Sequence, residues 1–99
     1  MPDFVITEAA QADLEQIDEY IAADNSDAAD RLLDDLYGAM QSAADDPERA
    51  GSIREDLTER DVRFVPVRKN YWVVYAKGGP ATITIVRVLH SRRDVRNVL

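Results

Sequence analysis

The fold is decided by a stretch near the end of the chain, Thr82-Ile83-Thr84-Ile85-Val86-Arg87-Val88-Leu89-His90-Ser91-Arg92-Arg93-Asp94. Its first half predicts a strand, because β-branched residues dominate and isoleucines alternate with threonines, as in a half-buried strand. The alternation breaks at Val86-Arg87-Val88-Leu89, which indicates either apolar cover on both faces or a β-bulge. An apolar strand thus delivers a cluster of basic residues to one edge of the fold: His90, Arg92, Arg93 and Arg96.

Length and composition predict one small domain. The 99 residues leave room for a single two-layer core, and we expect one domain over residues 1–99. No apolar run approaches the roughly 20 residues of a membrane span, so no membrane partner is expected. The chain has no cysteine and one histidine, which argues against a disulfide scaffold and against Cys/His metal sites. We therefore expect no metal, no cofactor and a cytoplasmic location.

Charge is divided unevenly along the chain. Residues 1–61 contain 18 acidic and 4 basic residues, whereas residues 62–99 contain 1 acidic and 8 basic residues. The net charge of −7 alone argues against a nucleic-acid-binding protein. The asymmetry instead predicts one face that meets anionic groups and another that is solvated or meets a basic partner.

The first half of the chain predicts a strand and two helices. Phe4-Val5-Ile6 is a short apolar run, and Thr7 is a good N-cap for a helix that ends near Ala23. Asn25 or Ser26 caps a second helix that runs to about Ala44. Because about three residues join the helices, they must form an antiparallel hairpin.

The second half predicts an antiparallel meander. Residues 48–61 have no clear periodicity and form a long connection, after which strands are expected at residues 62–67, 71–76 and 82–89, joined by short turns. The first strand must pair with this sheet. The expected fold is α+β with the order β-α-α-β-β-β, a helical hairpin packed on a small, mainly antiparallel, twisted sheet.

This order, together with particular motifs, resembles the RelE/ParE superfamily of toxins, and more narrowly its ParE branch. The matching segments are Ala12-Asp13-Leu14-Glu15-Gln16-Ile17, Asn25-Ser26-Asp27-Ala28-Ala29, Asn70-Tyr71-Trp72-Val73-Val74-Tyr75 and Arg87-Val88-Leu89-His90-Ser91-Arg92-Arg93-Asp94. The resemblance implies a small cytoplasmic toxin of a type II toxin–antitoxin system, silenced in a hetero-oligomer with its antitoxin. ParE-type toxins poison DNA gyrase, whereas RelE-type toxins cut mRNA on the ribosome.

The residues favour the gyrase alternative without excluding the other. Metal-free RNA cleavage needs a base, an acid and stabilisation of phosphorane charge. The candidates for a RelE-like site are Arg63, Arg68, Lys69, Arg87 and His90. Arginine stays protonated and is a poor base, and the resemblance makes His90 structural, for instance through a bond to a backbone carbonyl. Tyr71 and Tyr75 share a strand face, where sheet packing is their expected role. We therefore lean away from an enzyme and expect no small-molecule substrate; a third alternative is an inactive or non-toxic binding domain.

For a gyrase-directed toxin, Arg92 and Arg93 are the first candidates for target contact, followed by Arg87 and Arg96. Asp94 is expected to pair with Arg63 or Arg87. Candidates for antitoxin contact are apolar helix residues expected to be partly open, Leu33, Tyr37 and Met40. A second candidate surface for the antitoxin is an acidic stripe on the helices made of Asp13, Glu19, Asp30, Asp34 and Asp35.

Overall fold

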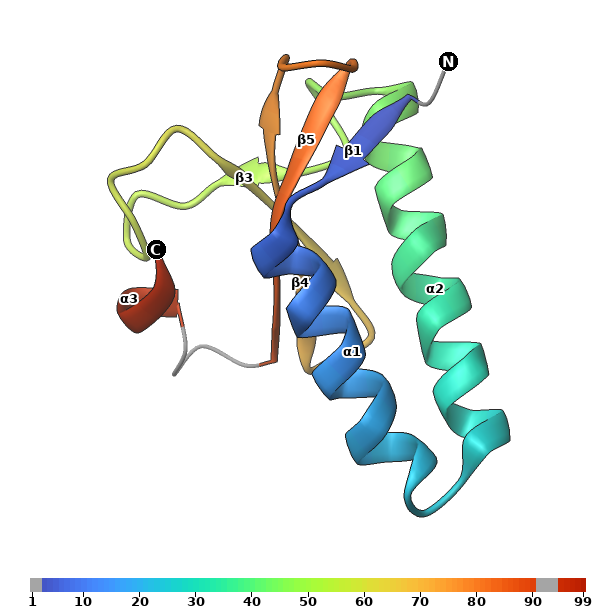
Figure 1. Cartoon of the computed structure of the whole chain (residues 1–99). Helices are drawn as coiled ribbons and strands as arrows, with labels where there is room; N and C mark the ends of the chain where they lie inside the picture. The colour runs from blue at the N-terminus through green and yellow to red at the C-terminus, as the bar shows by residue number, and fades with distance from the viewer. Residues whose placement is uncertain (1–2, 91–94) are drawn as a thin grey trace.

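The computed structural model describes residues 3–90 and 95–99, with the backbone alone at positions 96 and 97. A helical hairpin covers one face of a five-stranded sheet (Figure 1). This arrangement confirms the predicted α+β fold and its β-α-α-β-β-β order. The elements are β1 (Phe4–Ile6), α1 (Glu8–Ala22), α2 (Ser26–Asp45), β2 (Ser52–Ile53), β3 (Arg63–Val67), β4 (Tyr71–Lys77), β5 (Ile83–His90) and α3 (Val95–Val98).

Two short elements were missed from the sequence. Strand β2 has two residues and pairs antiparallel with β3, inside the segment expected to be an irregular connection. Helix α3 has four residues and contains Arg96, the last residue of the basic cluster. Neither is long enough to display a period of 2 or of 3.6 residues, so periodicity had no signal to offer.

The sheet has the strand order β1-β5-β4-β3-β2. Strands β3, β4 and β5 form the predicted antiparallel meander, and β1 adds to β5 in parallel. Helices α1 and α2 carry the chain from β1, at one edge of the sheet, to β2 at the opposite edge. Strand β5 is therefore central over its first three residues, where β1 covers its outer edge (Figure 1).

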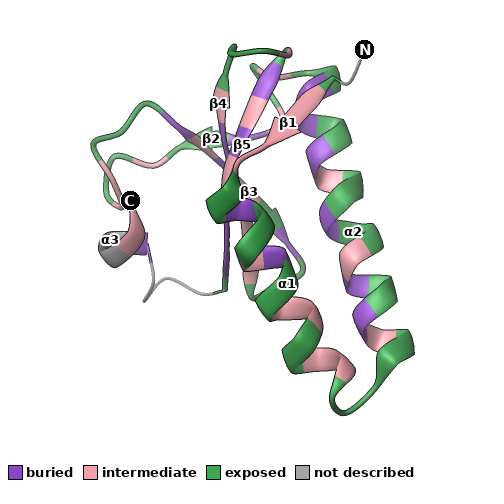
Figure 2. Cartoon of the chain, viewed as in Figure 1, coloured by how far each residue is buried: buried purple, intermediate pink, exposed green. Residues whose placement is uncertain are grey.

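Both helices begin at the expected caps. The Thr7 hydroxyl accepts a hydrogen bond from the Ala10 amide at 3.1 Å, and the Asn25 side chain accepts one from the Ala28 amide at 3.0 Å. Each cap satisfies a first-turn N–H that the helix itself leaves unpaired. In Figure 2 helix α2 carries buried and exposed residues in alternation, as expected when one face of a helix packs on a sheet.

The break in the β5 pattern reflects both explanations that the sequence left open. Val74 pairs with Arg87 and Tyr75 pairs with Ile85, so Val86 is an extra residue, a β-bulge. Apolar side chains also cover both faces of the sheet. The core on the helix side includes Leu14, Leu32, Leu36, Met40, Val73, Tyr75, Ile83, Ile85 and Val88. The core on the other face includes Val62, Phe64, Val74, Leu89 and Val95.

Among the described residues, no helix combines the length and the apolar character needed to cross a membrane.

Candidate functional site

The outer edge of β5 changes partner along its length. Strand β1 pairs with Ile83–Ile85 and then ends. Thr7 lies where β1 ends and α1 begins. Its amide donates to the Ile85 carbonyl at 3.1 Å, and its hydroxyl donates to the Val86 carbonyl at 2.9 Å. From this point helix α1, rather than a strand, lies beside β5 (Figure 1).

Asp13 joins α1 to β5 just beyond the bulge. Its carboxylate accepts hydrogen bonds from Nε and Nη2 of Arg87, both at 2.7 Å, and from the Val88 amide at 3.0 Å. The Asp13 side chain is only 12% exposed. Its expected place in an outward acidic stripe is therefore wrong, because α1 turns this position toward the strand edge.

A groove with a volume of about 550 Å³ continues from Asp13 between α1 and β5. We call it the α1–β5 groove, and its lining residues are Asp13, Gln16, Ile17, Tyr20, Tyr71, Arg87, Val88, Leu89, His90 and Val98. Tyr20 stands at the groove with 82% of its surface exposed, which is unusual for so large an aromatic residue. The groove thus combines a strand edge with aromatic walls.

His90 lies at the end of β5 and contacts Tyr71. Their ring centroids are 4.9 Å apart with an interplanar angle of 42°. Burial raises the pKa of the Tyr71 hydroxyl above its ordinary value, although Arg68 opposes the shift. Among the described residues, the contact shown for the His90 ring is this packing on Tyr71.

The other basic residues named for a RelE-like site, Arg63, Arg68 and Lys69, do not line the α1–β5 groove. Arg63 bonds to the Glu48 carbonyl at 3.2 Å and lies 3.6 Å from its carboxylate, at the β2 side of the sheet. Arg68, in the β3–β4 turn, pairs with Asp35 of α2 at 2.8 Å. Lys69 is exposed in the same turn. Because Arg63 is opposite Tyr75 and His90 is opposite Tyr71, they are four residues apart along the sheet, roughly 13 Å.

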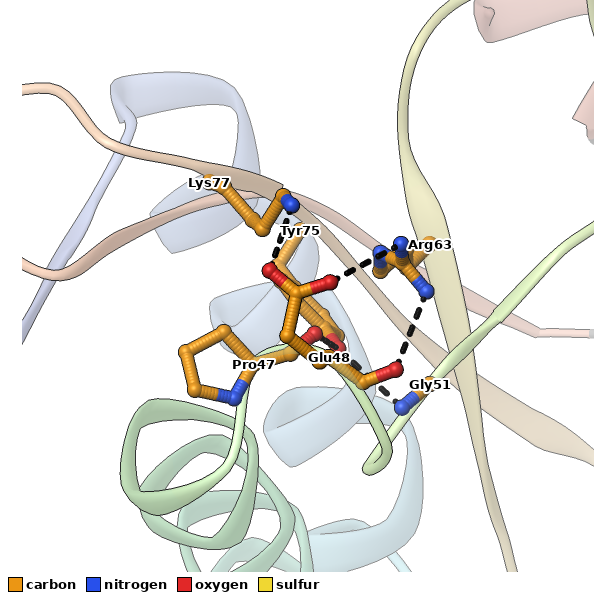
Figure 3. Close-up of polar contacts among 6 residues, drawn as sticks. All are labelled: Pro47, Glu48, Gly51, Arg63, Tyr75 and Lys77. Carbon is orange, nitrogen blue, oxygen red and sulfur yellow. Dashed lines mark hydrogen bonds and ion pairs between the residues drawn. The ribbon is translucent and has the colours of Figure 1, made fainter.

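Glu48 is the centre of a cluster that sequence reasoning missed (Figure 3). Its carboxylate accepts a hydrogen bond from Lys77 at 2.6 Å and faces Arg63 on its other side. The bond from Lys77, more than the charge of Arg63, lowers the pKa of Glu48. The residue stands in a segment without periodicity, so no local signal marked it.

Tyr75 anchors the segment that contains Glu48. Its buried hydroxyl donates to the Pro47 carbonyl at 2.7 Å and accepts from the Gly51 amide at 3.0 Å (Figure 3). A Cβ at Gly51 would stand 2.7 Å from the Tyr75 ring, so only glycine permits this approach. Burial raises the pKa of Tyr75. The expectation that Tyr75 packs within the sheet is confirmed.

The three candidate antitoxin contacts on α2 differ in exposure. Tyr37 is 40% exposed, and Leu33 is half-buried against the helix-side core. Met40 is completely buried, so its expected partial exposure is wrong. The reason is its position: Met40 lies one turn after Leu36 on the face of α2 that packs on the sheet.

Several predicted target-contact residues lie outside the described residues. These are Arg92, Arg93 and Asp94, together with the side chain of Arg96. Of the two expected partners of Asp94, Arg63 bonds to Glu48 and Arg87 bonds to Asp13. Arg87 is the only one of the four target-contact candidates whose side chain the structure describes, and 23% of that side chain is exposed.

The sequence and the fold define the class of protein together. The model of the ParE toxin family, ParE toxin of type II toxin-antitoxin system, parDE, matches residues 4–95, and the chain belongs to this family. The structure is similar to a solved chain described as the chromosomal ParDE TA system from P. aeruginosa. That likeness has a TM-score of 0.71 at 19% sequence identity and covers 89% of this chain and 94% of the other. No match was found among curated proteins.

Proposed function

We propose that this toxin, when free of its antitoxin, inhibits DNA gyrase and thereby stops DNA replication in the cytoplasm. Membership of the ParE family makes the chain a toxin of a type II toxin–antitoxin system. The gyrase target is the further step, supported by the arrangement of the basic residues.

The observation that carries the proposal is the pairing of the candidate nuclease arginines, Arg63, Arg68 and Arg87, with carboxylates. Arg87 and His90 line the same groove, but Asp13 binds Arg87, and Arg63 lies at the β2 side of the sheet. RNA cleavage would need a base and an acid within hydrogen-bond reach of one phosphate. A toxin that acts by binding a protein needs no such convergence, which is why we favour gyrase over mRNA.

We assign target contact to the basic C-terminal residues, Arg92 and Arg93 first and Arg96 next. Arg87 stays among the candidates because part of its side chain is exposed, although Asp13 binds its Nε and Nη2 atoms. The antitoxin, in a hetero-oligomer with the toxin, contacts Leu33 and Tyr37 on α2. Leu33 and Tyr37 are distant in sequence from the basic C-terminal residues, so variants can test the two sets of contacts separately.

Pulse labelling after brief induction of the toxin without antitoxin tests the target. We expect thymidine incorporation to stop before methionine incorporation, and purified gyrase to lose supercoiling activity when the toxin is added. If methionine incorporation stops first, the ribosome is the target, and Arg63, Arg68, Lys69, Arg87 and His90 become a nuclease site to dissect. Continued incorporation of both labels would indicate a non-toxic binding domain.

A further inference from the structure

Strand β5 has an edge that the described chain leaves partly unpaired. Successive residues of a strand direct their backbone groups to opposite sides. The Val88 amide points toward α1, where it donates to Asp13, so the Val88 carbonyl and the His90 amide and carbonyl point to that side as well. Among the described residues none of these three groups has a hydrogen-bond partner on the α1 side.

The geometry of this edge matches an extended peptide. Strand β1 already pairs in parallel with Ile83–Ile85, and the α1–β5 groove continues along the same edge of β5. Exposed strand edges accept additional strands, with backbone bonds supplying affinity and side-chain pockets supplying specificity. The groove offers such side-chain contacts through Ile17, Tyr20 and Tyr71.

We propose that the α1–β5 groove binds an extended segment of the toxin's target protein, which adds as a strand beside Val88–His90. This inference rests on the proposed function in one respect, that the toxin acts by binding a protein. The segment carries an apolar or aromatic side chain that packs against Tyr20 and Ile17. In sequence, Arg92 and Arg93 follow His90 by two and three residues, and we expect the same partner to offer acidic residues to them.

The target fits this groove better than the antitoxin does. No residue of α2 lines the groove, so Leu33 and Tyr37, the candidate antitoxin contacts, are not part of it. Arg87 and His90 both line the groove, and both belong to strand β5, which precedes the target-contact arginines in sequence. Because the strand edge and the target-contact arginines follow one another in sequence, we expect both to contact the same partner.

The double variant Gln16→Ala/Tyr20→Ala tests the side-chain wall. Both residues are exposed, so the fold tolerates their truncation. We expect the toxin concentration that half-inhibits supercoiling by purified gyrase to rise about tenfold or more, the loss of one good anchor residue. Growth arrest should weaken in parallel, while neutralisation by the co-expressed antitoxin persists. The matched control is Gln11→Ala/Glu15→Ala, exposed residues of the same helix that have the same spacing and do not line the groove.

A second pair of variants tests the strand edge itself. His90→Pro and His90→Ala both remove the ring that packs on Tyr71, but only the proline removes the His90 N–H that faces α1. Proline is tolerated at an outward-facing position of an edge strand, because no ladder bond is lost. We expect His90→Pro to inhibit gyrase several-fold more weakly than His90→Ala, with the same far-ultraviolet circular dichroism.

Four results would overturn the proposal. The groove variants could retain full growth arrest, or lose antitoxin binding while remaining toxic, or behave like the Gln11/Glu15 control; the fourth concerns His90. If the wild-type toxin arrests growth without inhibiting gyrase, the proposed target is wrong. The groove is then tested by the growth arrest that the same variants cause, since a weaker arrest would show that the groove binds another target protein. Equal activity of the two His90 variants excludes strand addition.

Discussion

Asp13 and Arg87 are 74 residues apart in sequence, yet the Asp13 carboxylate binds both Nε and Nη2 of Arg87 and the next amide of β5. This two-point contact is the geometry that an arginine fork and a carboxylate favour. It forms where β1 has ended and just beyond the bulge, and it links α1 to the sheet by hydrogen bonds in the wall of the groove.

Replacement of Asp13 by Asn should destabilise the fold by about 1–3 kcal/mol, because it weakens two charge-assisted bonds in a largely buried pair. Chemical denaturation measures the change in the free energy of unfolding. Glu15→Gln, an exposed acidic residue in the next position but one, is the matched control and should change stability by less than about 0.5 kcal/mol. Equal stability of the two variants would show that the pair contributes nothing.

The Tyr75 hydroxyl should contribute to stability through the segment that it holds. Tyr75→Phe leaves the Gly51 amide and the Pro47 carbonyl without their partner, and we expect a loss of about 1–3 kcal/mol. Tyr37→Phe, at an exposed position, is the control. Urea denaturation of both variants decides the point, and a neutral Tyr75→Phe would mean that water replaces the hydroxyl.

Glu48 should make stability depend on acid pH. Because the bond from Lys77 lowers the pKa of Glu48 in the folded state, its contribution is present above the pKa of the unfolded chain. That contribution disappears as the pH falls through the lower pKa of the folded state. We expect Glu48→Gln to reduce the melting temperature at pH 6 and to converge with the wild type at strongly acidic pH. A difference in melting temperature between the two proteins that stays constant across this pH range would contradict the assignment.

Variants of Met40 and Tyr37 should distinguish an effect on folding from an effect on antitoxin binding. Met40→Ala removes a completely buried side chain and should cost about 2–5 kcal/mol of stability. Tyr37→Ala should leave the unfolding free energy nearly unchanged but weaken antitoxin binding, measured by calorimetry with the purified antitoxin. Unchanged affinity in a folded Tyr37→Ala toxin would remove this residue from the antitoxin surface.

Arg92 and Arg93 should matter for toxicity and not for neutralisation. We expect the double variant Arg92→Ala/Arg93→Ala to abolish growth arrest while it still binds the antitoxin, because we propose that the antitoxin contacts α2 instead. Arg31→Ala/Arg49→Ala removes the same charge at exposed positions of the first half of the chain and serves as the control. Growth arrest by a folded Arg92/Arg93 variant would contradict the assigned target contact.

Local patterns in the sequence determined the helical hairpin, its caps, the β3–β5 meander and the irregularity in β5. These features depend on neighbouring residues: a cap bonds three residues away, and a strand pattern repeats every two. The motifs around Tyr71 and His90 also carried the family resemblance that the family match bears out.

Only the tertiary structure decided which surface each charged residue occupies. Asp13 belonged to an acidic stripe by helical position, but α1 packs beside a strand edge, and the carboxylate binds Arg87 instead. Met40 was expected to be partly open, but the hairpin presses it onto the sheet. Glu48 had no pattern at all until β3 and β4 brought Arg63 and Lys77 to it. Ion pairs and strand edges are set by the packing of distant segments, which local periodicity does not encode.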